Sequence, residues 1–493
     1  MSNEFNIKEQ RNLSMLMDFY ELTMSNGYFV NGVTDTIVYF DMFYRKNPDG
    51  AGFSITAGLE QLVLFVKNLK FTRNDIDFLR SKGVLSEQFL SYLLTFKFSG
   101  DIYAIPEGTV VFPNEAIVTI KAKVIEAQLI ETMLLLTINH QSLIATKANR
   151  IVRAAKGRPI LELGARRTHG ADAAIMGARA AYIGGVSGTA TTIAEQMYGV
   201  PATGTMAHSR VQFFGDEYKA FETYARTYPD TCTLLVDTYN VITCGIPNAI
   251  KVSKDVLEPI GKRLKAIRLD SGDLAYLSKK VRIMLDEAGL IDCKIVASNS
   301  LDEFIITELL NQNAKIDIFG VGERLVTAKS EPVFGGVYKL VAVEEEGVVV
   351  PRIKLSENEE KIINPGYKMC WRLYDKNTHK AIADVITLAG DVINETAPYR
   401  IFDPVLTWKK KKITNFYAKK LQVPIFINGE CIYTLPTIEE IRAYCKKQVD
   451  SIWDEVKRFS NPHKYFVDLS HELWIVKQEL IKKYRNLEEK NEK

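Results

Sequence analysis

The sequence predicts an α/β protein whose middle part folds as a parallel, TIM-like α/β barrel, either complete or short of full closure. Between about residues 135 and 342, short apolar or β-branched runs recur, and each leads through a polar or glycine-rich turn into a helical pattern. Such alternation is typical of parallel βα units. The charged and hydroxyl-bearing clusters of this region all follow directly after the expected strands. That is the rim where barrel active sites are assembled, which favours a barrel over an open doubly wound sheet.

Seven strands are expected in this part of the chain. They are Pro159–Leu163, Ala181–Ile183, Val200–Thr205, Cys232–Val236, Ala266–Leu269, Lys294–Ala297 and Ile316–Phe319. Amphipathic helical patterns at Leu274–Ala288 and Asp302–Gln312 fill two of the intervals between them.

The remaining sequence predicts three further regions. Residues 1–134 are expected to form an N-terminal α+β domain, residues 343–436 a strand-rich segment that returns to it, and residues 437–493 a C-terminal helical region. The elements expected there are helices at Ser14–Phe29, Gly58–Leu69, Thr437–Lys457 and Ser470–Arg485, and strands within Thr109–Ile120, broken at Pro113.

Composition excludes several classes of function. The 63 basic and 60 acidic residues leave a formal net charge of +3, which is too small to indicate a nucleic-acid-binding protein. The basic run Lys409–Lys412 is therefore interpreted as a solvated loop. The six cysteines form no CxxC pair and are expected to be reduced, and no His/Cys cluster has the spacing of a zinc site. Without a signal peptide or an apolar run of about 20 residues, the chain is expected to be cytoplasmic and not bound to a membrane.

Two clusters on the expected rim fit anionic substrates. In GVGER, the glycines of Gly320–Arg324 allow backbone N–H groups to approach a phosphate, and Arg324 adds charge, although a tight barrel turn is the alternative. In RLDSGD, the carboxylates of Asp270 and Asp273 lie close to Arg268. They suit ribose hydroxyls or a magnesium diphosphate, or alternatively serve as helix caps, and the sequence leaves both readings open.

Two further clusters complete the rim. GARR places Arg166 and Arg167 directly after a strand, so that one guanidinium faces the site and the other forms a surface ion pair. His208 follows another expected strand, and Asp237 ends the next one. A carboxylate beside an imidazole fixes its tautomer and raises its basicity, so this order favours a nucleophile or a general base over a structural histidine.

These clusters occur together with MLMDFYELTM, FDMFYRKNPDGAGFSITAGLE, INHQSLIATKANRIV, LELGARRTHGADAAIMGARAAYIGGVSGTATT and ASNSLDE. Over most of its length the chain thereby resembles the nicotinate phosphoribosyltransferase family, type II phosphoribosyltransferases related to the nicotinamide and quinolinate enzymes. The resemblance implies ATP-coupled transfer of phosphoribosyl from phosphoribosyl pyrophosphate to nicotinate, with Mg²⁺ accompanying the diphosphate and ATP. The products are nicotinate mononucleotide, an intermediate of NAD synthesis, and pyrophosphate.

The resemblance also implies roles for individual residues. His208 is the histidine phosphorylated by ATP, Asp237 is its supporting carboxylate, and Arg166 binds the nicotinate carboxylate. Asp18 and Tyr20 are implied to reach the pocket of a neighbouring subunit, which requires a homodimer. Ribose, diphosphate and 5′-phosphate would be bound by the remaining implied site residues: Arg45, Arg268, Asp270, Ser298, Asn299, Gly320 and Gly322.

Two positions depart from patterns of related enzymes. Many members of the family have threonine where this chain has Glu323, and a carboxylate there is expected to point away from the phosphate. Relatives that use nicotinamide carry an acid where this chain has Ala190. An acid would repel the carboxylate of nicotinate, so Ala190 favours nicotinate, with nicotinamide as the alternative substrate.

Overall fold

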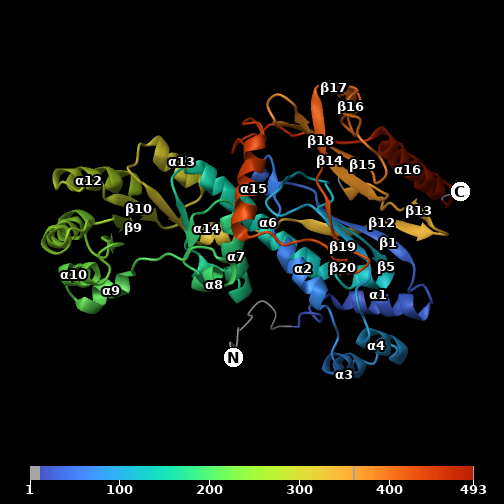
Figure 1. The fold of residues 1–493 in the computed structure, drawn as a ribbon, viewed down its shortest axis with the longest axis horizontal. Helices are drawn as coiled ribbons and strands as arrows, with labels where there is room; N and C mark the ends of the chain where they lie inside the picture. Colours follow the sequence, from blue (N-terminus) through green and yellow to red (C-terminus); the bar gives the residue numbers. More distant parts are fainter. Residues whose placement is uncertain (1–11, 359–360, 492–493) are drawn as a thin grey trace. The chain divides into compact units, whose positions relative to one another are not determined.

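The computed structural model describes residues 12–358 and 361–491, and within the chain two compact units are distinguished (Figure 1). One unit is continuous and covers Ile144–Pro332, whereas the other combines Met1–Leu143 with Val333–Lys493. No helix among the described residues is long and apolar enough to cross a membrane. The four-part domain division derived from the sequence stays a prediction.

The continuous unit is built on a sheet of six parallel strands in the order β7-β6-β11-β10-β9-β8. Its strands are β6 (Ile160–Glu162), β7 (Gly188–Thr189), β8 (Thr233–Leu235), β9 (Ala266–Leu269), β10 (Lys294–Ser298) and β11 (Ile318–Val321). Strands β7 and β8 are the two edges, so the sheet is open: of the two forms that the sequence left possible, the complete barrel is wrong and only the form short of closure is compatible with this sheet. The alternation of parallel strands and helices, in contrast, is confirmed.

Two of the seven expected strands account for the missing closure. Ala181–Ile183 forms the last turn of helix α7 (Ala171–Ile183), because its alanines continue the helix until the glycine pair Gly184–Gly185 ends it. Val200–Thr205 forms only a single parallel bridge, between Thr189 and Ala202, in place of a full strand. The chain between β7 and β8 therefore does not complete the ring.

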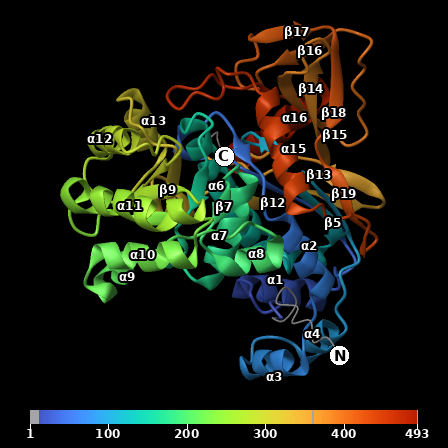
Figure 2. The same ribbon diagram turned by 60° about the vertical axis from the view of Figure 1, so that its left-hand side comes forward.

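Helices follow the strands of this unit, and several begin at a capping side chain. Asp273 caps α12 (Leu274–Glu287) by accepting from the Tyr276 N–H at 2.9 Å, and Asp302 caps α13 (Glu303–Asn311). Figure 2 shows three further helices side by side in this unit. They are α9 (His208–Phe214), α10 (Glu217–Thr227) and α11 (Ile246–Val252).

The other unit is built on a seven-stranded sheet in the order β13-β12-β1-β5-β3-β19-β20. Its strands come from both ends of the sequence: β1 (Ile37–Tyr44), β3 (Asp101–Ala104), β5 (Val118–Lys123), β12 (Gly336–Glu345), β13 (Val348–Pro351), β19 (Val423–Ile427) and β20 (Glu430–Cys431). Strand β12 pairs antiparallel with β1, and β19 pairs antiparallel with β3.

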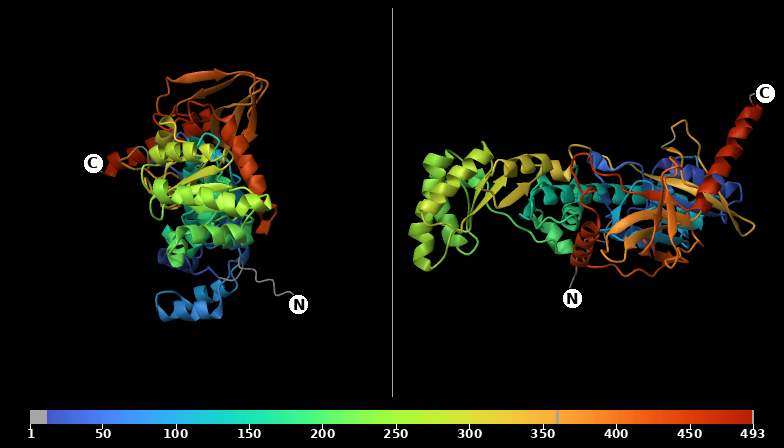
Figure 3. Two further views of the ribbon diagram at one scale, coloured as in Figure 1. Left: turned by 90° about the vertical axis from the view of Figure 1, so that its left-hand side faces the viewer. Right: turned by 90° about the horizontal axis from the view of Figure 1, so that it is seen from above.

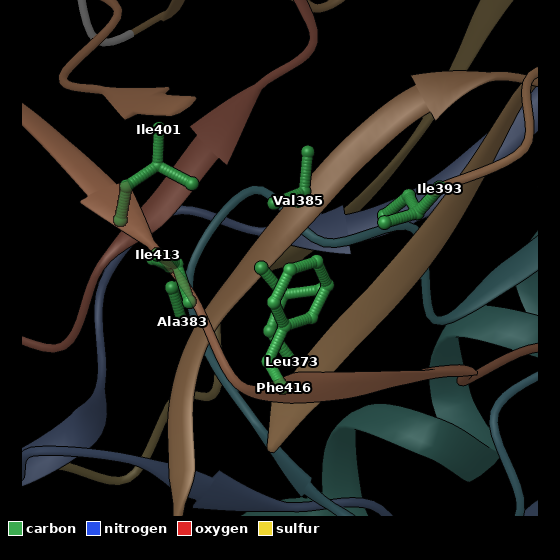
Figure 4. Packing of buried hydrophobic residues seen from close by; sticks show 7 residues of the cluster. All are labelled: Leu373, Ala383, Val385, Ile393, Ile401, Ile413 and Phe416. Atoms are coloured by element: carbon green, nitrogen blue, oxygen red, sulfur yellow. The ribbon is translucent and has the colours of Figure 1, made fainter. Parts of the chain in front are cut away.

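A second, four-stranded sheet in this unit has the order β18-β14-β15-β21. It consists of β18 (Phe416–Lys420), β14 (Lys368–Asp375), β15 (Ala381–Leu388) and β21 (Val467–Leu469), and the pair β16 (Tyr399–Phe402) and β17 (Lys410–Ile413) accompanies it. Leu373, Val385 and Phe416 belong to the buried apolar cluster that joins these strands (Figure 4). Burial of such side chains contributes about 1.5–3 kcal/mol each.

This unit also contains helices. They are α1 (Phe19–Val30), α2 (Leu59–Asn68), α3 (Arg73–Ser81), α4 (Glu87–Leu94), α5 (Val124–Gln128), α15 (Ile438–Ser451) and α16 (His471–Asn491). Figure 3 shows α16 leading to the C-terminal end of the chain. Helix α6 (Glu131–Ala154), which sequence analysis did not predict, has mixed polar and apolar residues and crosses the boundary between the two units.

Candidate active site

The carboxyl ends of four neighbouring strands in the continuous unit meet at one edge of the sheet. Leu235 of β8 pairs with Arg268 of β9, and Ser298 of β10 pairs with Gly320 of β11. Residues that follow these paired positions therefore lie at the edge where open α/β sheets bind ligands. The structure brings together here the predicted residues His208, Asp237, Arg268, Asp270 and Ser298.

Asp270 is the centre of this cluster. Its Oδ1 accepts a hydrogen bond from Nη2 of Arg268 at 2.8 Å and another from the Ser298 hydroxyl. Arg268 also donates from Nε to the Ser298 hydroxyl at 2.8 Å. The alternative that both carboxylates of RLDSGD cap a helix holds for Asp273 alone, and Asp270 instead remains a partly exposed carboxylate held beside a guanidinium.

Asp237 is held rigidly and is almost fully buried. Its Oδ2 accepts from the backbone N–H of Asp270 and from the Ser271 hydroxyl, both at 2.7 Å. Its Oδ1 is buried and has no hydrogen-bond donor among the residues that the structure describes. An unpaired buried carboxylate oxygen is costly, so this oxygen is suited to a proton donor or a cation.

His208 begins helix α9, and its side chain is 39% exposed. Its Nδ1 lies 3.1 Å from the Thr238 hydroxyl, while its Nε2 lies 3.9 Å from Asp237 Oδ1 and 3.7 Å from Asp270 Oδ2. The imidazole therefore stands between one hydroxyl and two carboxylates, with part of its ring open to solvent. The carboxylate of Asp237 thus lies near the imidazole, as expected, but at 3.9 Å it is too far away for a direct hydrogen bond.

A buried glutamate that sequence analysis missed organises the neighbouring loops. Glu162, at the end of β6, accepts from the Gly164 N–H and, at 2.5 Å, from the Thr189 hydroxyl, and burial raises the pKa of its carboxyl. It thus ties the turn before Arg166 to the turn that contains Ala190. In the sequence, this role is indicated only by the position of Glu162 as the last polar residue before the end of the strand in LELGARR. A single glutamate within an apolar run nevertheless gives no indication of its partner.

Arg166 and Arg167 lie in a short 3-10 turn, and both side chains are exposed. Neither guanidinium makes a hydrogen bond or an ion pair with any residue in the described part of the chain. The surface ion pair expected for one of them is therefore absent from these residues. Arg166 is available to an anion that enters from solvent.

The glycines of GVGER allow close packing at the same edge. A Cβ added to Gly320 would lie 2.5 Å from Leu163 Cδ1, and one added to Gly164 would lie 2.9 Å from the carbonyl oxygen of Gly322. Asn299, which follows Ser298, has a backbone φ of 90°, in the left-handed region that residues other than glycine rarely adopt. Such local strain is common where a backbone is shaped for a ligand.

The last two residues of the motif both have ionic partners. Arg324 forms an ion pair through Nη1 with Asp302, although its Nε is buried and has no hydrogen-bond partner among the described residues. Glu323 lies 3.9 Å from Nζ of Lys329. Its carboxylate is therefore directed toward a lysine.

Asp18, Tyr20 and Arg45 belong to the other unit. Asp18 precedes α1 without capping it, and the exposed Tyr20 lies in its first turn. Partial burial and the neighbouring Glu131 raise the pKa of the Tyr20 hydroxyl. Arg45 packs over the ring of Phe43 at 5.5 Å, and its Nε has no partner among the described residues.

The carboxylates of the cluster around His208 suit a cation that is also bound by a substrate. Within residues 12–358 and 361–491, no group of three or more His, Cys, Asp and Glu side chains could hold a metal ion without other ligands. Mg²⁺ is ordinarily held by one or two carboxylates together with water and phosphate oxygens. Asp237 Oδ1 and Asp270 Oδ2 offer two such oxygens on one side of the cluster.

Comparison with known proteins gives a consistent result along the chain. Three family models match: the nicotinate phosphoribosyltransferase (NAPRTase) N-terminal domain at residues 15–139, the NAPRTase family at 159–357 and the NAPRTase C-terminal domain at 367–477. The chain is 43% identical to the nicotinate phosphoribosyltransferase of Bacillus subtilis over 480 residues, 97% of each chain. It is 40% identical to a nicotinate phosphoribosyltransferase of Mycobacterium tuberculosis over 447 residues, 90% of this chain and 88% of the relative.

Solved structures show the same relationship. The crystal structure of human nicotinic acid phosphoribosyltransferase matches with a TM-score of 0.82 and 26% identity, covering 94% of this chain and all of the human chain. The nicotinate-nucleotide pyrophosphorylase of Pyrococcus furiosus matches with a TM-score of 0.67 and 26% identity, covering 92% of this chain and 97% of that one.

Proposed function

Because the chain belongs to the nicotinate phosphoribosyltransferase family, we propose that its open sheet edge carries the family's reaction, with His208 as the point where ATP enters. The activity is the transfer of phosphoribosyl from phosphoribosyl pyrophosphate to nicotinate, which releases pyrophosphate. The observation that carries the residue assignment is the contact of Arg268, Asp270 and Ser298 beside the buried Asp237 and the imidazole of His208.

The chemistry of the transfer explains this combination of charges. The pyridine nitrogen of nicotinate attacks C1 of the ribose, and the bond from C1 to the pyrophosphate oxygen breaks. Positive charge then develops on the sugar while negative charge accumulates on the leaving group. Asp270 lies where it can stabilise the sugar or bind its hydroxyls, and the Arg268 guanidinium, which Asp270 and Ser298 hold in place, can bind the diphosphate.

The imidazole of His208 has a separate task. The pyridine nitrogen is already a nucleophile, so the glycosyl transfer needs no side chain to attack the sugar. Carboxylates beside one imidazole nitrogen stabilise a proton there and make the ring a better nucleophile. With Asp237 and Asp270 near Nε2 and Thr238 at Nδ1, His208 is arranged to accept a phosphoryl group from ATP.

Magnesium fits the unpaired carboxylate oxygens of the cluster. Asp237 Oδ1 and Asp270 Oδ2 are the atoms that would hold it, together with phosphate oxygens of the substrates. When bound, the ion neutralises negative charge on the diphosphate and on ATP. In its absence, Asp237 still fixes the turn at Asp270 and Ser271 through its other oxygen.

The remaining predicted residues complete the binding of the substrates. Arg166 is proposed to bind the nicotinate carboxylate, and Asp18 and Tyr20 of a second copy would close that pocket in a homodimer. The 5′-phosphate and ribose would be held by residues at the ends of β10 and β11 and nearby: Asn299, Gly320, Gly322 and Arg324, with Arg45 assisting at the diphosphate.

A competition between the two bases tests the substrate assignment. The purified protein is incubated with ATP, Mg²⁺, phosphoribosyl pyrophosphate and equal amounts of nicotinate and nicotinamide, and both mononucleotides are quantified by chromatography. Nicotinate mononucleotide is the expected product, because the exposed Ala190 places no acid beside the base carboxylate. Formation of nicotinamide mononucleotide in its place would overturn the assignment.

A further inference from the structure

A cavity of about 450 Å³ lies in the unit that does not contain the His208 cluster. It is bounded by β17, by the loop after α15 and by the loop before β21. Apolar residues line part of the cavity, namely Ile382, Ile413, Val456 and the buried Tyr465. Its volume falls within the range of sites for small ligands.

Three lysines give this cavity a basic side. Lys411 and Lys412 belong to the basic run that the sequence singled out, and they reach the cavity from β17, while Lys464 faces it from the loop before β21. None of the three ammonium groups forms an ion pair or a side-chain hydrogen bond with any residue in the described part of the chain, although Lys464 lies close enough to Asp403 to help lower the pKa of that carboxyl. Ile413, the next residue of β17, is buried in the apolar cluster of Figure 4, so the strand that carries the lysines is fixed.

Two carboxylates also line the cavity, but one of them already accepts hydrogen bonds from neighbouring residues of the chain. Asp375 Oδ1 accepts hydrogen bonds from the backbone N–H groups of Asn377 and Thr378 and from the Thr378 hydroxyl. The other is the exposed Glu455, at the opposite loop. With three lysines against these two acids, the lining has a formal charge of +1 with His463 neutral, and the unoccupied groups are mainly cationic.

Aromatic side chains form the third component. Trp453 is 44% exposed, and its Nε1 donates to the Ala381 carbonyl at 2.7 Å, which fixes the orientation of the indole. Phe466 is 43% exposed and makes an edge contact with the ring of His463. A fixed aromatic surface beside free lysines is suited to a planar base with a phosphate attached.

We propose that this cavity, lined by Lys411, Lys412, Lys464, Trp453 and Phe466, binds a mononucleotide at a second site, separate from the catalytic cluster. The lysines bind the phosphate, and the aromatic rings stack on the base. A polymer is a poorer fit, because the free cations and the aromatic rings converge on one cavity rather than along a groove.

Photolabelling of the full chain with 8-azido-AMP, followed by peptide mapping, tests the proposal. Label is expected in peptides from 411–414 or 453–466, and unlabelled AMP should compete. Adenosine and inorganic phosphate should each compete at least tenfold less well. Competition by nicotinate mononucleotide, compared with AMP, identifies whether a purine or a pyridine base is preferred. Because the catalytic residues lie in other peptides, label at the His208 cluster is recorded separately.

Variants connect the label to the lysines. Lys411→Glu combined with Lys464→Glu should reduce labelling of these peptides at least tenfold, and the milder Lys411→Ala with Lys464→Ala should reduce it in the same direction. Lys482→Glu with Lys483→Glu makes the same change of charge on α16 and should leave the label unchanged. The proposal is overturned by label confined to residues 144–332, by equal competition from phosphate alone, or by unchanged labelling in both lysine variants.

Discussion

Oδ1 of Asp237 lies 3.9 Å from Nε2 of His208 and is buried without a hydrogen-bond donor, whereas Oδ2 of the same carboxylate is held by two donors from the adjacent strand end. The carboxylate is thus fixed by one oxygen and available through the other. Such an arrangement places one carboxylate oxygen next to the imidazole while the other oxygen holds the orientation of the carboxylate.

Replacement of His208 by alanine should separate the two reactions of the enzyme. Without the imidazole, formation of phosphoenzyme from γ-labelled ATP and ATP hydrolysis should be lost, while slow transfer of phosphoribosyl without ATP should remain. His169→Ala is the control, because His169 is an exposed histidine in the same unit. Normal coupling to ATP in the His208→Ala protein would show that phosphate is accepted elsewhere.

Asp237→Asn should reduce the rate of phosphoenzyme formation by roughly 10–100-fold. The amide oxygen can still accept from Asp270 and Ser271, so the fold is expected to survive, but the amide nitrogen would face His208 in place of a carboxylate. Rapid-quench measurement of labelled protein gives the rate, and thermal unfolding checks stability. A wild-type rate in a stably folded variant contradicts the proposed role of Asp237.

Arg166→Ala should raise the KM for nicotinate by roughly tenfold or more, because a charge-assisted hydrogen bond contributes about 1.5–3 kcal/mol. The KM for phosphoribosyl pyrophosphate should change much less. Arg167→Ala removes the same charge from the next exposed position and serves as the matched control. Equal changes in both KM values would indicate a structural role for Arg166.

Glu21 should make the stability of its unit depend on pH. Burial raises the pKa of this carboxyl from 4.5 to about 7, although Thr132 donates to it. In the unfolded chain the proton leaves near pH 4.5, so the stabilisation present below that pH is lost as the pH rises to about 7. The shift corresponds to on the order of 3 kcal/mol.

Glu21→Gln should therefore flatten this dependence and stabilise the protein at pH 8 relative to wild type. Denaturant unfolding between pH 4.5 and 8 measures the effect. Glu287→Gln, at an exposed position of α12, should leave the slope unchanged. If the Glu21→Gln protein keeps the wild-type slope, another group is responsible for the pH dependence.

The strand ends that carry chemistry were predictable from local pattern. Asp270 and Ser298 each end an apolar run, and parallel pairing brings such ends together regardless of their distance in sequence. Ala181–Ile183 misled the prediction because a short apolar run fits a strand and the end of a buried helix equally well. The three-residue run alone could not distinguish them, because the helix to which it belongs begins ten residues earlier, at Ala171.

Contacts made across the sheet edge were beyond local pattern. Glu162 and Thr189 are 27 residues apart and meet only because β6 and β7 are neighbours. Thr238 was overlooked for a related reason, since its hydroxyl acquires a role only when α9 places His208 beside it. Residues at the strand ends could thus be singled out from the sequence, whereas the contacts of Glu162, Thr189 and Thr238 required the structure.

The interleaving of β1, β5 and β3 with β12 and β19 has a consequence for synthesis on the ribosome. Strands β1, β5 and β3 can pair with one another early, but the outer edges of β1 and β3 stay open until residues 336–345 and 423–427 have emerged. The continuous unit, in contrast, has all six of its parallel strands between residues 160 and 321. Translation therefore delivers the complete parallel sheet while the first-made strands still have open edges, the stage at which aggregation competes with folding.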